Sequence, residues 1–263
     1  MTTNTIVVIR DFKPGDDVFC KELIREATMS TVNASFITGL TQEITFQGIV
    51  ICAAVMFIFL GVPLSYCLAA IPVFLFLMYV FIWLGHTMKA IELTQEMNNI
   101  ARMYMSSQHT GFWVAEVYDP PILLGGVKKN FRFETVTEKE FLTRNINVNP
   151  SKKVVVGTVA IARSRTHPDD CARLRRLSVA PLYRGHGIGK ALTEVALSFC
   201  RSCGYSRTEA VTSECHDMAR RLLMGKGFEM HQMYHRPILG RLVAVVMYEL
   251  VLKFRSAPTS QEP

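Results

Sequence analysis

A glycine-rich turn between a short strand and a helix is the stretch of the sequence with the clearest chemistry. It reads Arg184-Gly185-His186-Gly187-Ile188-Gly189-Lys190. Glycine allows the backbone to come close to a phosphate group, and the first N–H groups of a helix have no acceptor within the helix. The arginine and the lysine add positive charge beside those groups. The turn therefore indicates a phosphate-binding site, with a purely structural turn as the alternative.

The spacing within the turn excludes two common nucleotide-binding motifs. No Lys-Ser or Lys-Thr pair follows the glycines, so the turn is not a P-loop. The glycines are too close together for a dinucleotide-binding fingerprint, and no acidic residue ends a second strand about 20 positions later.

The residues around the turn resemble the coenzyme-A-binding motif of GNAT-superfamily acetyltransferases. Residues 179–192 read V-x-P-x-Y-R-G-x-G-I-G-x-x-L, and the family pattern Arg/Gln-x-x-Gly-x-Gly/Ala falls on Arg184, Gly187 and Gly189. The resemblance implies acetyl-CoA as co-substrate. It assigns the pyrophosphate to residues 184–190, and the pantetheine arm to the backbone of Leu177, Ser178 and Val179.

Two strand motifs narrow the resemblance to the camello-like N-acetyltransferases. These are Phe-Trp-Val-Ala at residues 112–115 and Arg-Arg-Leu-Ser-Val at residues 175–179. The family also carries an apolar segment between the first helices of its domain, and it includes N-acetylaspartate synthetase and cysteine-S-conjugate N-acetyltransferase. The stretches Asn33–Phe36 and Gly39-Leu40 are nearer to the aspartate enzyme.

The order of the strands and helices predicted around the turn resembles that of the GNAT fold, which is an α/β fold. We expect a mixed central β-sheet flanked by helices and interrupted by a hydrophobic membrane hairpin. The first strand and helix occupy residues 1–43, the hairpin 44–85, and the rest of the domain 86–256 with an irregular insertion at 119–152. Residues 257–263 are expected to be a disordered tail. Predicted strands lie at 6–10, 112–118, 154–162, 174–179, 208–213 and 241–253. Of the predicted helices, the first follows Asp16, which is expected to cap it, and the second spans 86–104. The third begins near 187, and the fourth spans 218–224.

A run of 42 residues without a charge, from Ile44 to Gly85, predicts the membrane hairpin. As one helix it would measure roughly 63 Å, twice the ~30 Å thickness of the hydrocarbon layer. Gly61-Val62-Pro63 interrupts it near the middle, and Pro72 can kink the second half. Two short spans or a re-entrant hairpin fit better, with a buried hairpin of a soluble domain as the alternative. Because the flanking strands belong to one sheet, we expect an even number of crossings.

Charge and cysteine content limit the partners. The net charge of +7 is scattered, so nucleic acid is not an expected partner, whereas an anionic cofactor and the lipid bilayer are. Cys200 and Cys203 have no second pair that would complete a zinc site, so we expect no metal. The unpaired cysteines favour a reducing compartment, so we expect the catalytic domain to face the cytosol. The membrane that holds it is expected to be the endoplasmic reticulum. The oligomeric state stays open.

Catalytic groups are expected on the last strands of the domain. The candidates for the base are Glu209 and a water held by Ser213, while a solvated strand-face carboxylate is the alternative for Glu209. Family members often carry a tyrosine that protonates the departing coenzyme A, and Leu223 replaces it here; Tyr234 or water can substitute. We interpret His186 as a turn residue and His216 as a helix cap.

Arg175 and Arg176 are the candidate substrate-binding residues. Because successive strand residues point to opposite faces, we expect only one of them to face the acceptor. The predicted reaction is acetyl transfer from acetyl-CoA to the amine of a small amino acid or amino-acid conjugate, aspartate first and a cysteine S-conjugate second. The alternatives are a protein lysine N-acetyltransferase and a catalytically weakened, membrane-held coenzyme A binder.

Overall fold

The computed structural model describes residues 4–118, 132–144, 153–164, 170–239 and 243–254. These residues form two compact units. Thr28–Glu92 make up one unit, here called the hairpin unit, and the chain before and after them makes up the other, here called the sheet unit. The expected disordered tail, 257–263, lies outside the described residues.

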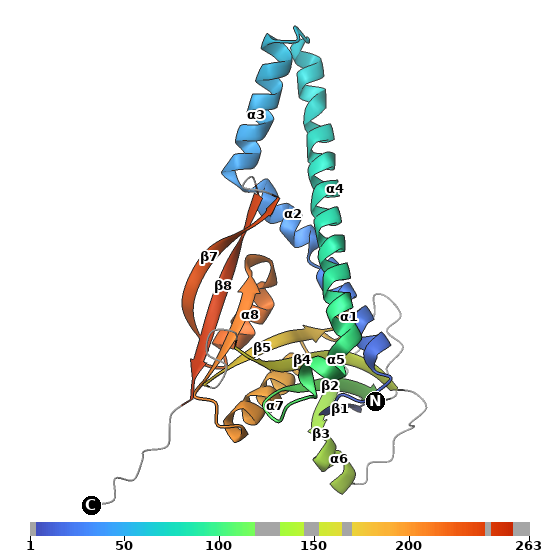
Figure 1. Cartoon of the computed structure of the whole chain (residues 1–263). Helices are drawn as coiled ribbons and strands as arrows, with labels where there is room; N and C mark the ends of the chain where they lie inside the picture. Colours follow the sequence, from blue (N-terminus) through green and yellow to red (C-terminus); the bar gives the residue numbers. More distant parts are fainter. Residues whose placement is uncertain (1–3, 119–131, 145–152, 165–169, 240–242, 255–263) are drawn as a thin grey trace, which may run out of the picture. The chain divides into compact units, whose positions relative to one another are not determined.

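The sheet unit is built on an eight-stranded mixed sheet of the described residues (Figure 1), with the order β3-β1-β2-β4-β5-β6-β8-β7. The mixed α/β architecture agrees with the predicted fold class. The strands are β1 (Asn4–Asp11), β2 (Gly111–Tyr118), β3 (Arg132–Thr137), β4 (Lys153–Arg163), β5 (Cys171–Val179), β6 (Arg207–Ser213), β7 (Glu229–Leu239) and β8 (Val243–Lys253). Its helices are α1 (Asp17–Met29, which runs on into the hairpin unit), α5 (Ile100–Tyr104), α6 (Glu138–Thr143), α7 (Ile188–Ser202) and α8 (Asp217–Met224).

Apolar side chains cover both faces of this sheet. On one face, Ile188, Leu192 and Ala196 of α7 pack on strand residues that include Ile9 and Trp113. On the other face, a second cluster joins α1 and α5 to the sheet through Cys20, Ile24, Ile100, Tyr104, Phe112 and Val114. The central strands are therefore buried on both sides, as expected for strands enclosed by helices.

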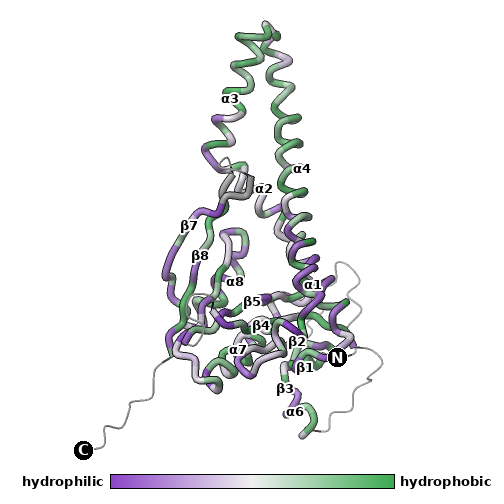
Figure 2. Tube along the Cα trace, in the orientation of Figure 1, coloured by the Kyte–Doolittle hydropathy of each residue, from purple (hydrophilic) through white to green (hydrophobic). Residues whose placement is uncertain are grey.

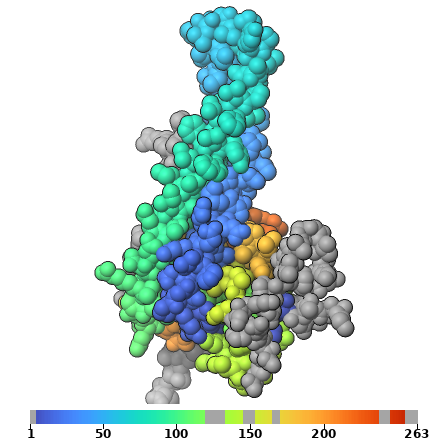
Figure 3. Space-filling model, turned by 90° about the vertical axis from the view of Figure 1, so that its right-hand side faces the viewer, coloured from blue at the N-terminus to red at the C-terminus, as the bar shows by residue number. Residues whose placement is uncertain are grey.

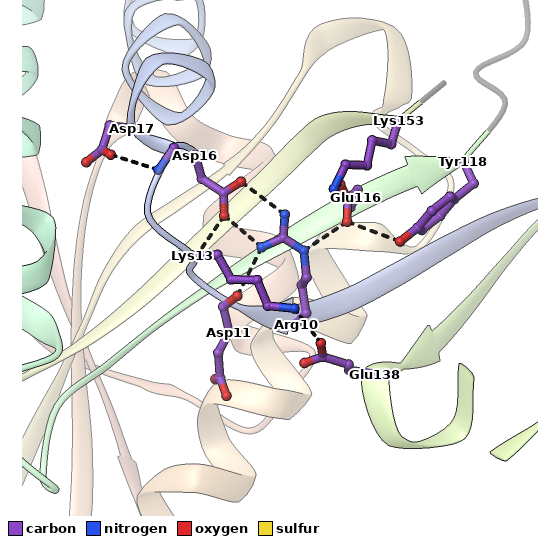
Figure 4. Close-up of polar contacts among 10 residues, drawn as sticks. Arg10, Asp11, Lys13, Asp16, Asp17, Glu116, Tyr118, Glu138 and Lys153 are labelled. Atoms are coloured by element: carbon purple, nitrogen blue, oxygen red, sulfur yellow. Dashed lines mark hydrogen bonds and ion pairs between the residues drawn. The ribbon is translucent and has the colours of Figure 1, made fainter. Parts of the chain in front are cut away.

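A buried charge network ties β1 to its neighbours (Figure 4). Arg10 of β1 donates to Asp16 at 2.7 Å and, through Nε, to Glu116 of β2 at 2.8 Å. Glu116, only 2% exposed, also pairs with Lys153 at 3.1 Å and accepts from the Tyr118 hydroxyl at 3.4 Å. Two positive and two negative side chains thus balance one another, which is the arrangement that buried charges require.

The same network lowers the pKa of both carboxyl groups. Burial by itself raises the pKa of Asp16, but the hydrogen bonds from Arg10 and from the Lys13 amide outweigh it. Burial likewise raises the pKa of Glu116, and the hydrogen bonds from Arg10 and Lys153 outweigh it. Asp16 was expected to cap the first helix, but its carboxylate accepts from Lys13 and Arg10, which precede α1 in the chain.

Parts of the sequence prediction are wrong in the sheet unit. The irregular insertion at 119–152 contains β3, which pairs parallel with β1, and α6, which begins with a Thr137–Glu140 capping box. A strand at 229–239, β7, was missed, and the expected final strand 241–253 is β8, whose partners are β6 and β7. The expected helix 86–104 is the end of α4 followed by a short 3-10 turn, Met97–Asn99, and α5.

The hairpin unit consists of α2 (Val32–Leu40), α3 (Glu43–Ile58) and α4 (Leu64–Glu96, whose last four residues belong to the sheet unit). The break falls at residues 59–63, where Gly61 has φ +62°, in agreement with the predicted interruption. Figures 1 and 3 show α3 and α4 side by side, and a Cβ at Gly48 of α3 would lie 3.6 Å from Phe74 of α4. Pro72 lies inside α4 without ending it.

Hydrophobic residues dominate the parts of α3 and α4 next to the turn that connects them, and hydrophilic residues appear toward the other ends (Figure 2). By length and composition, the helical stretch Leu64–Tyr104 can cross a membrane, and the bent pair of stretches Asp17–Leu40 and Glu43–Ile58 passes the same test when taken together. Most of the large apolar side chains of α3 and α4 are exposed.

Candidate functional site

The glycine-rich turn forms a concave backbone at the N-terminus of α7. Gly185 and Gly187 have φ of +83° and +84°, the left-handed region that favours glycine. A Cβ on either residue would meet no atom within 4 Å, so the space beside the turn is open. The Ala191 amide makes the first helical bond, to the Gly187 carbonyl at 3.0 Å. The amides of Ile188, Gly189 and Lys190 therefore lie at the end of the helix that attracts anions.

Strands β5 and β6 separate next to the turn. Their parallel pairing runs from Cys171 with Arg207 to Leu174 with Ala210. Beyond this point β5 pairs only with β4 within the described residues, so its other edge is open along Leu177, Ser178 and Val179. An open strand edge offers amide and carbonyl groups to an extended ligand. The Ser178 hydroxyl is buried there and has no partner in the described part of the chain.

These features fit an extended ligand with a phosphate group at one end. The turn offers amides to the phosphate, and the open strand edge offers hydrogen bonds to an amide-containing chain. This is the distribution of groups in acetyl-CoA, with pyrophosphate followed by pantetheine.

Two contacts fix the turn in place. Arg184 donates through Nε to the Val179 carbonyl at 2.9 Å, which ties the turn to the end of β5. On the other side, the Phe133 ring of β3 packs on the His186 ring, with centroids 4.5 Å apart. Phe133 also makes an edge contact with Tyr183, 6.0 Å between centroids. His186 is thus a turn residue, as predicted, and the insertion supplies its packing partner.

Arg175 and Arg176 both contact the carboxylate of Glu96, near the end of α4. The Arg175 contact measures 3.4 Å, and Arg176 forms the shorter ion pair with the same oxygen. The expectation that the two arginines lie on opposite faces is wrong. Arg176 has φ +56°, so it leaves the extended conformation on which alternation depends. The Thr158 hydroxyl of β4 holds this distorted residue by donating to its carbonyl at 2.9 Å.

This cluster keeps an uncompensated positive charge beside the open edge of β5. Two guanidinium groups share one carboxylate in the contacts described above. Arg176 is the more buried, with 11% of its side chain exposed against 28% for Arg175. Its Nε is buried and has no partner among the described residues. A buried donor without an acceptor is costly, and an anionic ligand would satisfy it.

Glu209 lies where β5 and β6 are still paired. It is opposite Arg173 in the register, is 9% exposed, and accepts from the Ser164 hydroxyl at 3.2 Å. Burial, together with the neighbouring Glu209, raises the pKa of the Cys171 thiol to about 12. Glu209 therefore sits among partners at the closed end of the strand pair.

Ser213 and Tyr234 lie in one row at the open end. Ser213 is opposite Met247 of β8, and Met247 is opposite Tyr234 of β7. Two strand spacings separate them, about 10 Å, whereas Glu209 is about 13 Å from Ser213 along β6. The structure thus brings Ser213 and Tyr234 to one end of the sheet and leaves Glu209 at the other.

His216 makes a contact that was not predicted. Its Nδ1 lies 2.7 Å from the Ser213 hydroxyl. The residue does occupy the N-cap position of α8, but its side chain makes no capping hydrogen bond. A serine hydroxyl beside an imidazole can pass a proton.

Three residues near the site escaped sequence reasoning. Glu96 is 79 positions from Arg175, so no local spacing rule connects them. Phe133 lies in an insertion that carried no motif. Glu249 is opposite Val211, two residues along the strands from the Ser213–Met247 pair, and no hydrogen bond or ion pair joins its side chain to another described residue. Glu249 is the single acidic residue in the apolar run VAVVMYELVL, and this was the signal in the sequence that could have identified it.

Leu223, which stands where the family often has tyrosine, is 3% exposed and packs in the core. Its side chain has no ionisable group, so any proton donor must come from another position. No group of three potential metal-binding side chains occurs within the described ranges.

In sequence, the chain is similar to known acetyltransferases. The model of the acetyltransferase (GNAT) family matches residues 118–228. N-acetyltransferase 8B of Rattus norvegicus is 28% identical over 225 residues, covering 81% of this chain and 86% of that protein. N-acetyltransferase 8 of Mus musculus is 29% identical over 255 residues, covering 94% and 93%. The solved structure of an acetyltransferase from Salmonella typhimurium with acetyl-CoA matches with a TM-score of 0.40 and 13% identity, covering 65% of this chain and 78% of that one.

Proposed function

We propose that this chain is a GNAT-type N-acetyltransferase, similar to the N-acetyltransferase 8 proteins. On that premise, it acetylates a small amino acid or amino-acid conjugate. Acetyl-CoA is the co-substrate. Aspartate is the first candidate acceptor and a cysteine S-conjugate the second. The hairpin unit holds the enzyme at a membrane, and the sheet unit faces the cytosol.

The reaction is a direct transfer. The uncharged amine of the acceptor attacks the thioester carbonyl, so a C–N bond forms while the C–S bond breaks. Coenzyme A leaves as a thiolate, which is a fair leaving group because an ordinary thiol has a pKa near 8.5. The amine loses one proton to a base, and the thiolate gains one from an acid or from water.

Residues at the open end of the sheet supply the proton transfers. The Ser213–His216 pair accepts the proton of the amine, directly or through a water, and Tyr234 in the same row is the candidate donor to the thiolate. Glu209, the other candidate base, is buried among partners, which favours a supporting role.

The backbone of Leu177–Val179 and the glycine-rich turn would hold acetyl-CoA. The open strand edge pairs with the pantetheine amides, and the amides of residues 188–190 with the pyrophosphate. Arg184 and Lys190 add charge at the same end of α7.

The Arg175–Arg176–Glu96 cluster is the observation that supports an acceptor with a carboxylate. Its net charge is positive, and the buried Nε of Arg176 has no partner among the described residues. An α-carboxylate would give this donor its acceptor and would place the neighbouring amine beside Leu177–Val179. A plain amine or a lysine side chain within a peptide has no such carboxylate.

The test is an acceptor panel with the full-length protein and acetyl-CoA, reading free coenzyme A. The panel contains aspartate, S-benzylcysteine, a lysine-containing peptide with blocked termini, and a simple monoamine. We expect turnover with one or both carboxylate-bearing amino acids. Turnover confined to the peptide or the monoamine would contradict the proposal and favour protein or amine acetylation.

A second function has one specific observation in its favour. Because Leu223 is buried and carries no proton donor, the chain can be a membrane-held coenzyme A binder with weakened catalysis. Acetyl-CoA binding by calorimetry without turnover on any acceptor would support this alternative.

The membrane arrangement requires both ends of the hairpin on the cytosolic side of an internal membrane, the endoplasmic reticulum being the first candidate. Thiol labelling of sealed membranes would test it at Cys203 and at a cysteine introduced by Glu22→Cys, because the natural Cys20 is buried and Glu22 is exposed. Labels that reach these two positions from opposite sides would contradict the hairpin.

A further inference from the structure

The turn of the hairpin, residues 59–63, carries no polar or charged side chain. Phe59-Leu60-Gly61-Val62-Pro63 connects α3 to α4, and Phe59 is 80% exposed. The nearest charged residues along the chain are Glu43 on one arm and Lys89 on the other. A connection that emerged on the far side of a bilayer would normally carry polar residues.

The backbone of the turn also makes hydrogen bonds within itself. The Phe59 amide donates to the Val55 carbonyl at 3.0 Å, and the Val62 amide to the Met56 carbonyl at 3.2 Å. Pro63 has no amide hydrogen. The buried Cys67 thiol lies 3.6 Å from the Val62 carbonyl and donates to it. Backbone groups in hydrocarbon must find their hydrogen-bond partners within the protein, because the lipid offers none, whereas backbone groups in water need not.

The α3 arm is too short to cross a bilayer, although the longer α4 arm by itself has the length to do so. Helix α3 has 16 residues, about 24 Å, and begins with the charged Glu43. On the other arm, polar contacts begin at Tyr79, whose hydroxyl donates to Asn33 at 3.4 Å, and continue with His86 and Ser35 at 3.1 Å. Residues 64–79 between the turn and this polar level again measure about 24 Å. The hydrocarbon layer is ~30 Å thick, so the turn ends inside it.

We propose that the hairpin inserts from one side only and that its partner surface is the phospholipid monolayer of a neutral-lipid droplet. This inference rests on the proposed membrane anchoring and goes beyond it. A one-sided hairpin needs headgroups at its base and apolar medium at its tip, and it needs no second aqueous phase. In a bilayer the exposed tip would lie ~6 Å from the opposite headgroups, whereas below a monolayer the apolar medium continues into the neutral lipid. Ester carbonyls of that lipid can accept from the Tyr66 hydroxyl next to the turn.

The experiment compares flotation of the full-length protein with two kinds of particle: phosphatidylcholine liposomes, and triolein droplets coated with a phosphatidylcholine monolayer. Two matched variants add one positive charge each, Leu60→Lys at the tip and Thr41→Lys at the exposed base between α2 and α3. Acetyl-CoA binding in detergent confirms that each variant is folded.

We expect the native protein to bind the droplets at least as well as the liposomes. Leu60→Lys should weaken droplet binding by about 50- to 300-fold, the cost of a lysine in hydrocarbon, while Thr41→Lys should change it less than 3-fold. Binding to liposomes alone would overturn the monolayer inference and leave membrane anchoring intact, whereas binding to neither particle would overturn both. Droplet binding by Leu60→Lys equal to the native protein, or equal losses in both variants, would overturn the placement of the tip in neutral lipid.

Discussion

Phe133 packs its ring on His186, with the centroids 4.5 Å apart, and thereby connects the insertion to the glycine-rich turn. Phe133→Ala should loosen the turn without removing any group that touches the acetyl donor. We expect the KM for acetyl-CoA to rise about 3- to 10-fold, the value of one aromatic contact, while kcat changes less than 2-fold. Steady-state kinetics with varied acetyl-CoA checks this. Phe141 of α6, which stacks on Tyr118, offers the control Phe141→Ala; a similar rise in KM there would point to the stability of the insertion and not to the turn.

Gly187→Glu should abolish binding of coenzyme A. The left-handed backbone disfavours any side chain at this position, and the new carboxylate would enter the open space proposed for the pyrophosphate. Gly204 has φ +78° and equally open surroundings at the far end of α7, so Gly204→Glu carries the same backbone strain. We expect both variants to lose about 1–2 kcal/mol of unfolding free energy and only the first to lose affinity in calorimetry. Native affinity in Gly187→Glu would refute the site.

Arg176→Gln should lower kcat/KM for a carboxylate-bearing acceptor by about 10- to 150-fold. This corresponds to the 1.5–3 kcal/mol typical of one charge-assisted hydrogen bond. Arg173, three positions earlier on β5, provides the control, since it lies where β5 is still paired with β6. A loss in Arg173→Gln as large as in Arg176→Gln would show that general positive charge, and not the buried guanidinium, selects the acceptor.

Ser213→Ala and His216→Gln should each lower kcat by about 10²- to 10⁴-fold with little change in the KM for acetyl-CoA, because they belong to one proton-transfer unit. Their effects should not add in the double variant. Glu209→Gln should instead lower the unfolding free energy, since its carboxylate accepts from the Ser164 hydroxyl in a buried position. Full activity in both Ser213→Ala and His216→Gln, with loss in Glu209→Gln, would transfer the role of the base to Glu209.

Acid should destabilise the sheet unit through Asp16 and Glu116. The pKa of each is lower in the folded chain than in the unfolded one, so their stabilising effect is complete above pH ~5 and is lost as the pH falls through ~4 and below. Glu116→Gln should cost about 3–5 kcal/mol at pH 7 and flatten this pH dependence. Urea unfolding at pH 7, 5 and 3.5 measures both effects.

Glu134 offers the matched control for this prediction. It pairs with Arg144 at 2.7 Å, but both side chains are about half exposed. Glu134→Gln should therefore change the unfolding free energy by less than ~1 kcal/mol at every pH. Equal losses in Glu116→Gln and Glu134→Gln would mean that the buried network has no special role.

The sequence predicted the parts of the molecule that local chemistry determines. Hydrophobic runs located the central strands and the hairpin, and glycine spacing located the turn at Gly187. The insertion was misread because β3 depends on pairing with β1, more than 120 positions away. The arginine pair was misread because a left-handed residue within a strand has no signature in the identity of Arg176. Glu96 was missed because its partners come from a distant strand.

The position of β1 in the sheet has a consequence for synthesis. Its two neighbours, β2 and β3, both follow the hairpin in the chain, and β2 begins 100 residues after β1 ends. At 5–20 residues per second, a ribosome needs about 5–20 s to supply the first partner strand. During this interval α3 and α4 have already emerged. The hairpin can therefore enter lipid before the sheet closes, and a nascent chain whose hairpin stays in water would expose its apolar arms while β1 is still unpaired.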